Sequence, residues 1–209
     1  MKILVVGQSR SGSTLLCNII KTIYKINKIN LDFTFDTSDF KSDYEIKKIH
    51  KYNDYLHKKC DFIFSCRRDL RDSIVSGYKT LLKPWNSAFG KEWTYFDVGN
   101  DLLREYEDWE GKEDYEFIYE DYFQDKHKIL NQIAASLEIN ADPEKILDII
   151  QKDKPVDIND DTKIHLKARK GLSSNGGKIG VYETFFSKEE IDKINKRYES
   201  FLKRKGYLW

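Results

Sequence analysis

The sequence predicts a single α/β domain over residues 1–209, with a mainly parallel central sheet and helices on both of its faces. Three observations support this fold class. Short apolar runs, typical of buried strands, alternate along the chain with longer segments of helical periodicity. Strands separated by helices pair in parallel, because each helix carries the chain back across the sheet. A glycine-containing loop also joins the first apolar run to the first helical segment.

Apolar runs predict the strands. The clearest ones cover residues 3–6, 61–66 and 115–119, and each is rich in β-branched or aromatic side chains. A further strand is predicted within residues 44–52, where Ile46 and Ile49 stand among polar residues.

Helical spacing of apolar residues predicts the helices. They begin after residue 13, cover residues 70–81, 93–109, 126–137 and 142–152, and resume after Ser187. Ser187 and Glu190 have the spacing of a capping box at the start of the last helix. Residues 154–186 are polar and glycine-containing, so they are predicted to form a loop region over the site.

The composition excludes several classes of partner. The chain has 36 Lys and Arg against 35 Asp and Glu, a formal net charge of +1, so no overall field attracts nucleic acid or an anionic membrane. The first apolar run is too short for a signal peptide or a membrane span, which predicts a cytoplasmic protein. Cys17, Cys60 and Cys66 are odd in number and irregularly spaced, which predicts free thiols and no metal cluster.

The loop after the first strand has the glycine spacing of a P-loop. Gly7 and Gly12 flank four residues, and such a loop directs backbone N–H groups and a helix N-terminus at a phosphate. Ser13 occupies the place of the lysine that reaches the β- and γ-phosphates of a nucleoside triphosphate, and the loop cation is Arg10 instead. The strand over residues 61–66 also leads to arginines rather than to a magnesium-binding aspartate. These departures argue against a kinase.

The motif Arg-Ser-Gly-Ser-Thr resembles the 5′-phosphosulfate loop of sulfotransferases that use 3′-phosphoadenosine 5′-phosphosulfate (PAPS), which have a P-loop NTPase-like fold. The resemblance implies a donor loop formed by Arg10, Ser11, Gly12, Ser13 and Thr14. A second stretch, residues 68–76, is similar to the family motif whose arginine and serine bind the donor's 3′-phosphate. That resemblance assigns Arg68 and Ser76 to the 3′-phosphate, and a guanidinium and a hydroxyl are both suited to an anion.

The segment Lys48-Ile-His50 resembles the family's Lys-x-His element, in which the histidine is the catalytic base. A neutral imidazole accepts a hydroxyl proton at physiological pH, and Lys48 is expected on the same strand face to act on the sulfuryl oxygens. His57 is a nearby competitor without this context, and other branches of the family use a glutamate.

Two further resemblances concern the rest of the donor. Tyr119 matches a family tyrosine at the adenine end, although a core-edge tyrosine is the competing interpretation. Arg169, Lys170 and Gly171 resemble the Arg-Lys-Gly that wraps the 3′-phosphate. Compared with the family, this chain has about six extra residues between this motif and the next matching segment. The alignment is therefore open, and Lys178 competes with Arg169 and Lys170 for this role. Leu15 stands where an adenine-stacking tryptophan is common.

Together these motifs predict an enzyme that transfers a sulfuryl group from PAPS to a hydroxyl or amine of a small-molecule or carbohydrate acceptor. The other product is 3′-phosphoadenosine 5′-phosphate (PAP), and no metal is expected. The alternatives are a P-loop kinase and a non-catalytic nucleotide-binding protein.

Overall fold

The computed structural model of the protein describes residues 1–79, 94–152 and 178–209. The chain divides into two compact units. The first combines Met1–Arg67 with Glu105–Asn159, and the second combines Arg68–Arg104 with Asp160–Trp209. The prediction of one domain over residues 1–209 stays a prediction.

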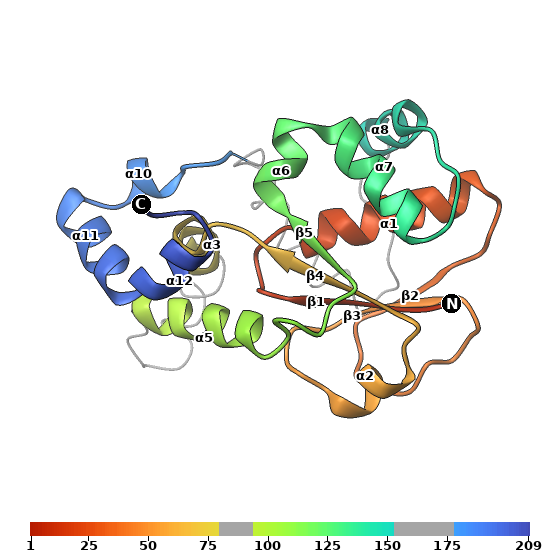
Figure 1. Cartoon of the computed structure of the whole chain (residues 1–209), viewed down its shortest axis with the longest axis horizontal. Helices are drawn as coiled ribbons and strands as arrows, with labels where there is room; N and C mark the ends of the chain where they lie inside the picture. Colours follow the sequence, from red (N-terminus) through yellow and green to blue (C-terminus); the bar gives the residue numbers. More distant parts are fainter. Residues whose placement is uncertain (80–93, 153–177) are drawn as a thin grey trace. The chain divides into compact units, whose positions relative to one another are not determined.

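A five-stranded parallel sheet forms the centre of the first unit, which confirms the predicted fold class (Figure 1). Its strands are β1 (Lys2–Gly7), β2 (Asp32–Thr34), β3 (Glu45–Lys48), β4 (Phe62–Arg67) and β5 (Tyr115–Ile118). They lie in the order β2-β3-β1-β4-β5, and each neighbouring pair is parallel. The chain therefore continues from β1 to one side of the sheet and later to the other. This makes the carboxyl end of β1 a topological switch point, where ligands bind in such sheets.

The edge of the sheet differs from the sequence prediction. β2 was not predicted, because its three residues contain no apolar run. β3 is shorter than the predicted segment of residues 44–52, yet all of its residues are buried. Glu45 and Lys47 within it form a buried ion pair, with Nζ and Oε1 2.9 Å apart. Charged residues that satisfy each other in this way hide a buried strand from any hydrophobicity pattern.

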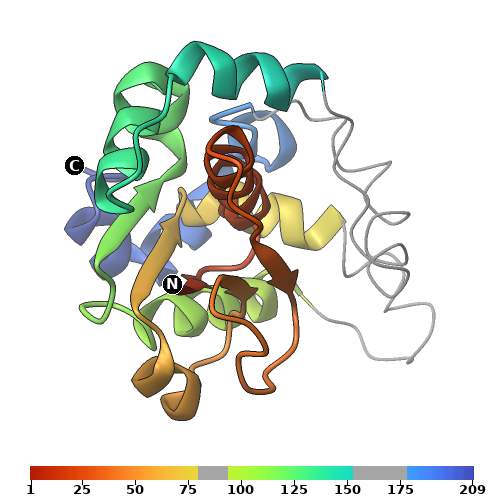
Figure 2. The same cartoon turned by 90° about the vertical axis from the view of Figure 1, so that its right-hand side faces the viewer.

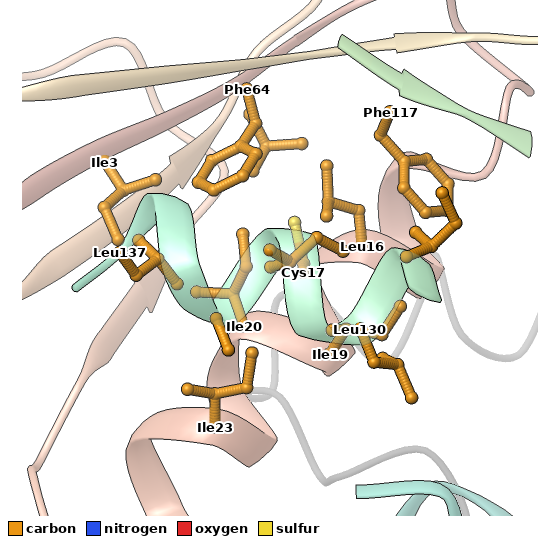
Figure 3. Packing of buried hydrophobic residues seen from close by; sticks show 14 of the residues in the cluster. Ile3, Leu16, Cys17, Ile19, Ile20, Ile23, Phe64, Phe117, Leu130 and Leu137 are labelled. Atoms are coloured by element: carbon orange, nitrogen blue, oxygen red, sulfur yellow. The ribbon is translucent and has the colours of Figure 1, made fainter. Parts of the chain in front are cut away.

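One face of the sheet is covered by α1 (Ser13–Ile26), α6 (Tyr119–Gln124), α7 (Lys126–Ser136) and α8 (Pro143–Lys152) (Figure 1). Figure 3 shows side chains of the strands facing those of α1 in this core. Completely buried examples are Ile3, Phe64, Phe117, Leu16 and Ile20. Burying one such side chain contributes about 1.5–3 kcal/mol. The apolar residues spaced along α1 therefore pack this helix against the sheet, and this packing also fixes the end of the loop that precedes it.

The opposite face is covered by α2 (Asp54–Lys59), so helices lie on both faces as predicted. Figure 2 shows α8 and α2 on opposite sides of the strands. Leu56 of α2 is buried in a second core with Trp109 and Val6. This six-residue helix was not predicted because it offers one buried residue and no apolar stripe.

The second unit is helical in its described residues. It contains α3 (Leu70–Gly77), most of α5 (Tyr95–Glu107), α10 (Tyr182–Phe185), α11 (Lys188–Arg197) and α12 (Glu199–Arg204). The predicted capping box at Ser187 and Glu190 is present. The predicted final helix is broken at Tyr198, whose hydroxyl donates to the carbonyl of Phe96 at 2.9 Å and to Oδ1 of Asn100 at 3.2 Å. Within the described ranges every helix is too short or too polar to traverse a bilayer.

Candidate nucleotide-binding site

The P-loop spacing lies where the sequence predicts it, between β1 and α1 at the switch point of the sheet. Gly12 immediately precedes α1, no side chain of the described residues caps this helix, and its first turn has no acidic residue. The N-terminus of a helix attracts anions through its backbone N–H groups and its dipole. An uncapped first turn without acidic residues therefore suits a bound phosphate or sulfate.

Both loop glycines are required by the backbone. Gly7 and Gly12 have φ angles of +90° and +96°, which favour glycine. A Cβ on Gly7 would lie 2.9 Å from the carbonyl oxygen of Cys66, and a Cβ on Gly12 would lie 2.5 Å from Cδ2 of Tyr119.

Burial raises the pKa of the Cys66 thiol well above 9.0, so this group stays neutral beside Gly7.

Arg10 has a left-handed backbone, with a φ of +66°. Such a conformation costs a residue with a side chain roughly 1–2 kcal/mol, so other contacts must hold the turn. The Ser11 hydroxyl provides one of them by donating to the carbonyl oxygen of Gln8 at 2.5 Å. Ser11 and Ser13 are buried, while Arg10 and Thr14 are partly exposed. The loop therefore has a buried, hydrogen-bonded interior and offers Arg10 and Thr14 toward its surface.

Lys48 reaches the loop from the carboxyl end of β3. Its Nζ donates to Oγ1 of Thr14 at 2.9 Å, and the side chain is mostly buried. The ammonium group also lies 5.5 Å from the centroid of the Phe35 ring. β3 and β1 are neighbouring parallel strands, so the residue that ends β3 is brought beside the loop that follows β1.

His50 also contacts the loop. Its Nδ1 lies 2.9 Å from the carbonyl oxygen of Gly7. A carbonyl oxygen only accepts, so Nδ1 carries the proton, and in the neutral ring Nε2 carries the lone pair. The indole N–H of Trp109 donates to the backbone carbonyl of His50 at 3.0 Å, which fixes the backbone of this residue. The imidazole therefore has the tautomer that a general base needs.

His57, the competing histidine, has different surroundings. Its Nδ1 lies 2.9 Å from the hydroxyl of Tyr52, and its ring packs edge-on against Trp109. It belongs to α2, on the face of the sheet opposite to α1. These contacts describe a packed surface histidine.

Tyr119 follows β5 and begins α6, and only 8% of it is exposed. Its ring lies against Gly12, as the close approach to a Cβ there shows, and it packs against Phe123 at 4.8 Å between centroids. The structure thus brings Tyr119 to the loop as part of the core. These contacts fit the competing interpretation of Tyr119, in which it is a tyrosine at the edge of the core.

In the second unit, the Arg68 guanidinium lies beside Lys178. Its Nη2 donates to the carbonyl oxygen of Lys178 at 2.8 Å and to Oδ2 of Asp72 at 3.2 Å. Asp72 also accepts the backbone N–H of Gly180 at 2.9 Å and that of Tyr182 at 3.1 Å. Asp72 is only 1% exposed, so a buried carboxylate joins the start of α3 to the segment that leads into α10.

Arg71 has a different role from its neighbour Arg68. Its guanidinium forms a paired contact with Asp69, at distances from 2.7 to 3.2 Å, and stacks on the Tyr182 ring at 4.2 Å. It also donates to the carbonyl oxygen of Tyr207 at 2.8 Å. These contacts make Arg71 a structural residue of the second unit.

Ser76 lies one helical turn beyond Asp72 on α3 and is partly exposed.

Arg169, Lys170 and Gly171 lie outside the described residues. Among the described residues, Lys178 of the three competing basic residues is thus the one that has a structural context, next to Arg68. The loop group and the Arg68 group belong to different units, so their joint action on one nucleotide remains a proposal.

Sequence reasoning missed Glu105. Its carboxylate accepts the backbone N–H of Ser9, within the P-loop, at 2.9 Å. It stands in α5 among other charged residues, and nothing in the sequence distinguishes it from Glu107, two residues later.

No protein-family model and no curated protein matches the sequence. Solved structures do match. Mouse sulfotransferase SULT7A1 complexed with PAP has a TM-score of 0.68 at 16% identity, over 96% of this chain and 84% of that chain. Retinol dehydratase in complex with retinol and PAP has a TM-score of 0.57 at 14% identity, over 97% and 81% of the two chains. Retinol dehydratase with androsterone and inactive cofactor PAP gives 0.58 at 13%, over 97% and 80%. The five-stranded parallel sheet, the loop after β1 and these likenesses together show that the chain has the P-loop-like sulfotransferase fold that its motifs predict.

Proposed function

We propose that this protein is a sulfotransferase that moves a sulfuryl group from PAPS to a hydroxyl or amine of a small-molecule or carbohydrate acceptor. One observation carries the proposal. Two residues at the carboxyl end of β3 each contact the P-loop: Lys48, the last residue of the strand, through Thr14, and His50, two residues later, through Gly7. A cation, a base of suitable tautomer and an anion-binding loop are thus held together in the first unit.

The described residues fit the 5′ end of this donor. The uncapped N-terminus of α1 and the backbone of Ser11, Gly12 and Ser13 suit a phosphosulfate, and Arg10 adds a positive charge. The loop lacks the P-loop lysine that a magnesium triphosphate needs, which disfavours a kinase. The neighbouring structures SULT7A1 and retinol dehydratase are complexes with PAP, which supports PAPS as donor and PAP as product here.

Residues of the second unit are proposed to hold the 3′-phosphate. Arg68 lies two residues before α3 begins and Ser76 lies near its end, and the basic residue that closes over the 3′-phosphate is Arg169, Lys170 or Lys178. The hydrogen bond from Arg68 to the carbonyl of Lys178 supports Lys178. Gly171 is proposed to bind the 3′-phosphate together with Arg169 and Lys170. Tyr119 is proposed to contact the adenine end of the donor.

The proposed reaction is an in-line displacement at sulfur. Nε2 of His50 takes the proton of the acceptor as the acceptor atom bonds to sulfur, while the bond from sulfur to the 5′-phosphate oxygen breaks. PAP leaves, and its growing negative charge is stabilised by Arg10, the loop N–H groups and the hydroxyl of Ser13 or Thr14. Lys48 acts on the sulfuryl oxygens. One well-placed donor of this kind contributes about 3–4 kcal/mol to transition-state stabilisation.

A comparison of two nucleotides tests the proposal. We expect PAP to raise the melting temperature strongly, because it binds the folded state, and ATP with magnesium to raise it little. A direct assay then follows transfer from labelled PAPS to a panel of phenols, alcohols, amines and sugars. A larger shift with ATP and magnesium would instead support the kinase alternative, and PAP binding without transfer in any assay would support a non-catalytic binding protein.

Arginine variants test which residues hold the donor. Arg10→Ala and Arg68→Ala should each weaken PAP binding at least tenfold, since each removes a charged hydrogen-bond donor. Arg104→Ala is the matched control, because Arg104 is exposed and pairs with Asp101. If Arg68→Ala binds PAP as the wild type does, the second unit does not hold the 3′-phosphate.

A further inference from the structure

We propose that Glu105 is a positioning residue that holds the P-loop in the shape that directs Arg10 at the donor. This inference rests on the proposed function, and it concerns a residue outside every motif of the sequence. Glu105 is part of α5, a helix that has no other assigned role in the site.

The contact is between the loop backbone and a side chain far away in sequence. The N–H of Ser9 donates to Oε2 of Glu105 at 2.9 Å, in a partly buried environment. A hydrogen bond to a charged acceptor is stronger than one between neutral groups. Ser9 is the third residue of the loop and directly precedes Arg10.

The position of Glu105 is itself fixed by its neighbour Tyr106. The Tyr106 hydroxyl donates to Oε1 of Glu116 at 2.7 Å, and burial raises the pKa of this hydroxyl, which keeps it protonated as a donor. Glu116 belongs to β5 and accepts two hydrogen bonds at 3.1 Å from the guanidinium of Arg67, the last residue of β4. The carboxyl-terminal part of α5 is therefore tied to two strands of the sheet, and Glu105 is presented from a rigid support.

Two hydrogen bonds bracket Arg10. Ser9 is held by Glu105 on one side, and the Ser11 hydroxyl donates to the carbonyl of Gln8 on the other. Arg10 between them has the left-handed backbone that an arginine adopts only when its surroundings require it. The direction of the Arg10 side chain depends on this turn, so we infer that loss of the Glu105 contact redirects Arg10.

The charge of Glu105 opposes its geometric role. A carboxylate beside an anion-binding loop repels the donor, so charge alone would make Glu105 unfavourable for binding. Variants separate the two effects. Glu105→Gln keeps an acceptor of the same reach and removes the charge, whereas Glu105→Asp keeps the charge and shortens the reach. Glu105→Ala removes both, and Glu107→Ala, exposed on the same helix, is the control.

The experiment is a titration of each full-length variant with PAP and with adenosine 3′-phosphate, which lacks the 5′ group that the P-loop binds. We expect Glu105→Asp and Glu105→Ala to bind PAP about tenfold more weakly and adenosine 3′-phosphate unchanged. Glu105→Gln should bind PAP as tightly as the wild type or up to about fivefold more tightly. A merely structural defect would weaken both ligands and lower the melting temperature of every Glu105 variant.

Several results would overturn the inference. One is that Glu105→Asp binds PAP like the wild type; another is that Glu105→Gln loses as much affinity as Glu105→Ala. An equal loss for both nucleotides would also overturn it. Failure of the proposed function is a separate outcome, because wild-type protein that binds no PAP would reject the sulfotransferase proposal before any variant is compared.

Discussion

The imidazole Nδ1 of His50 lies 2.9 Å from the carbonyl oxygen of Gly7, the residue with which the P-loop begins. This contact links the proposed base to the proposed donor site through one backbone atom. It orients the ring and, because the carbonyl oxygen accepts a hydrogen bond from Nδ1–H, leaves the Nε2 lone pair as the basic site of the neutral imidazole.

The first prediction concerns this histidine. His50→Ala should lower kcat at least a hundredfold, because general base catalysis contributes about 10²–10⁴ in rate, and should change PAP affinity less than threefold. His57→Ala, on α2, is the control and should keep wild-type turnover. Transfer rates with labelled PAPS and PAP titrations provide the measurement; unchanged kcat in His50→Ala would refute the assignment.

Gly12 is the second target. Gly12→Ala places a residue with a side chain at an unfavourable φ of +96° and puts its Cβ 2.5 Å from the Tyr119 ring. We therefore expect the free energy of unfolding and the free energy of PAP binding each to fall by roughly 2–4 kcal/mol. Gly111→Ala is a matched control, since its φ is +76° but no atom of the described part of the chain lies within 4 Å of a Cβ there. It should cost only about 1 kcal/mol, the strain of the backbone itself. Urea unfolding of both variants measures the difference, and equal losses would show that the contact with Tyr119 is unimportant.

A third prediction tests the buried carboxylate of the second unit. Asp72→Ala leaves the N–H groups of Gly180 and Tyr182 without their acceptor and removes the ion pair of Arg68, so the protein should lose about 3 kcal/mol of stability. Asp72→Asn keeps one carbonyl acceptor and should lose less. Thermal unfolding gives the comparison, with Asp192→Ala, which is exposed on α11, as the control. A change below about 0.5 kcal/mol for Asp72→Ala would contradict this role.

The fourth prediction is a pH dependence that arises at Glu45. Burial alone would raise the pKa of Glu45, but hydrogen bonds from the Lys41 backbone, Lys47 and Thr34 outweigh it and lower the pKa below its ordinary value of 4.5. A lowered pKa in the folded state means that this carboxylate stabilises the protein above pH 4.5. That stability is lost as the pH falls through the folded-state value.

Glu45→Gln provides the test. The neutral amide cannot titrate, so the free energy of unfolding of this variant should fall less steeply below pH 4.5 than that of the wild type. Urea unfolding at several pH values between about 3 and 7 gives the two slopes. Asp61→Asn, which changes an exposed carboxylate directly before β4, is the control. Identical slopes for Glu45→Gln and wild type would contradict the assigned pKa direction.

The sequence by itself determined the fold class, the P-loop spacing and the position of α1. Each of these depends on local patterns: apolar runs for β1, β4 and β5, helical spacing after residue 13, and glycines where φ is positive. The same patterns did not predict β2, α2 or the short length of β3. β2 is stabilised by pairing with β3, α2 by one buried leucine, and β3 by a buried ion pair. None of these interactions produces a periodic pattern in the sequence.

Only the tertiary structure decided which residues contact one another at the loop. Lys48 and Thr14 are 34 residues apart, and Ser9 and Glu105 are 96 apart, so no local pattern relates them. Parallel pairing of β3 with β1 brings the first pair together, and the ties from Tyr106 through Glu116 to Arg67 place the second. The tertiary structure likewise showed that Asp72 holds backbone N–H groups more than a hundred residues away, because a buried carboxylate is stable only where donors from elsewhere in the chain converge on it.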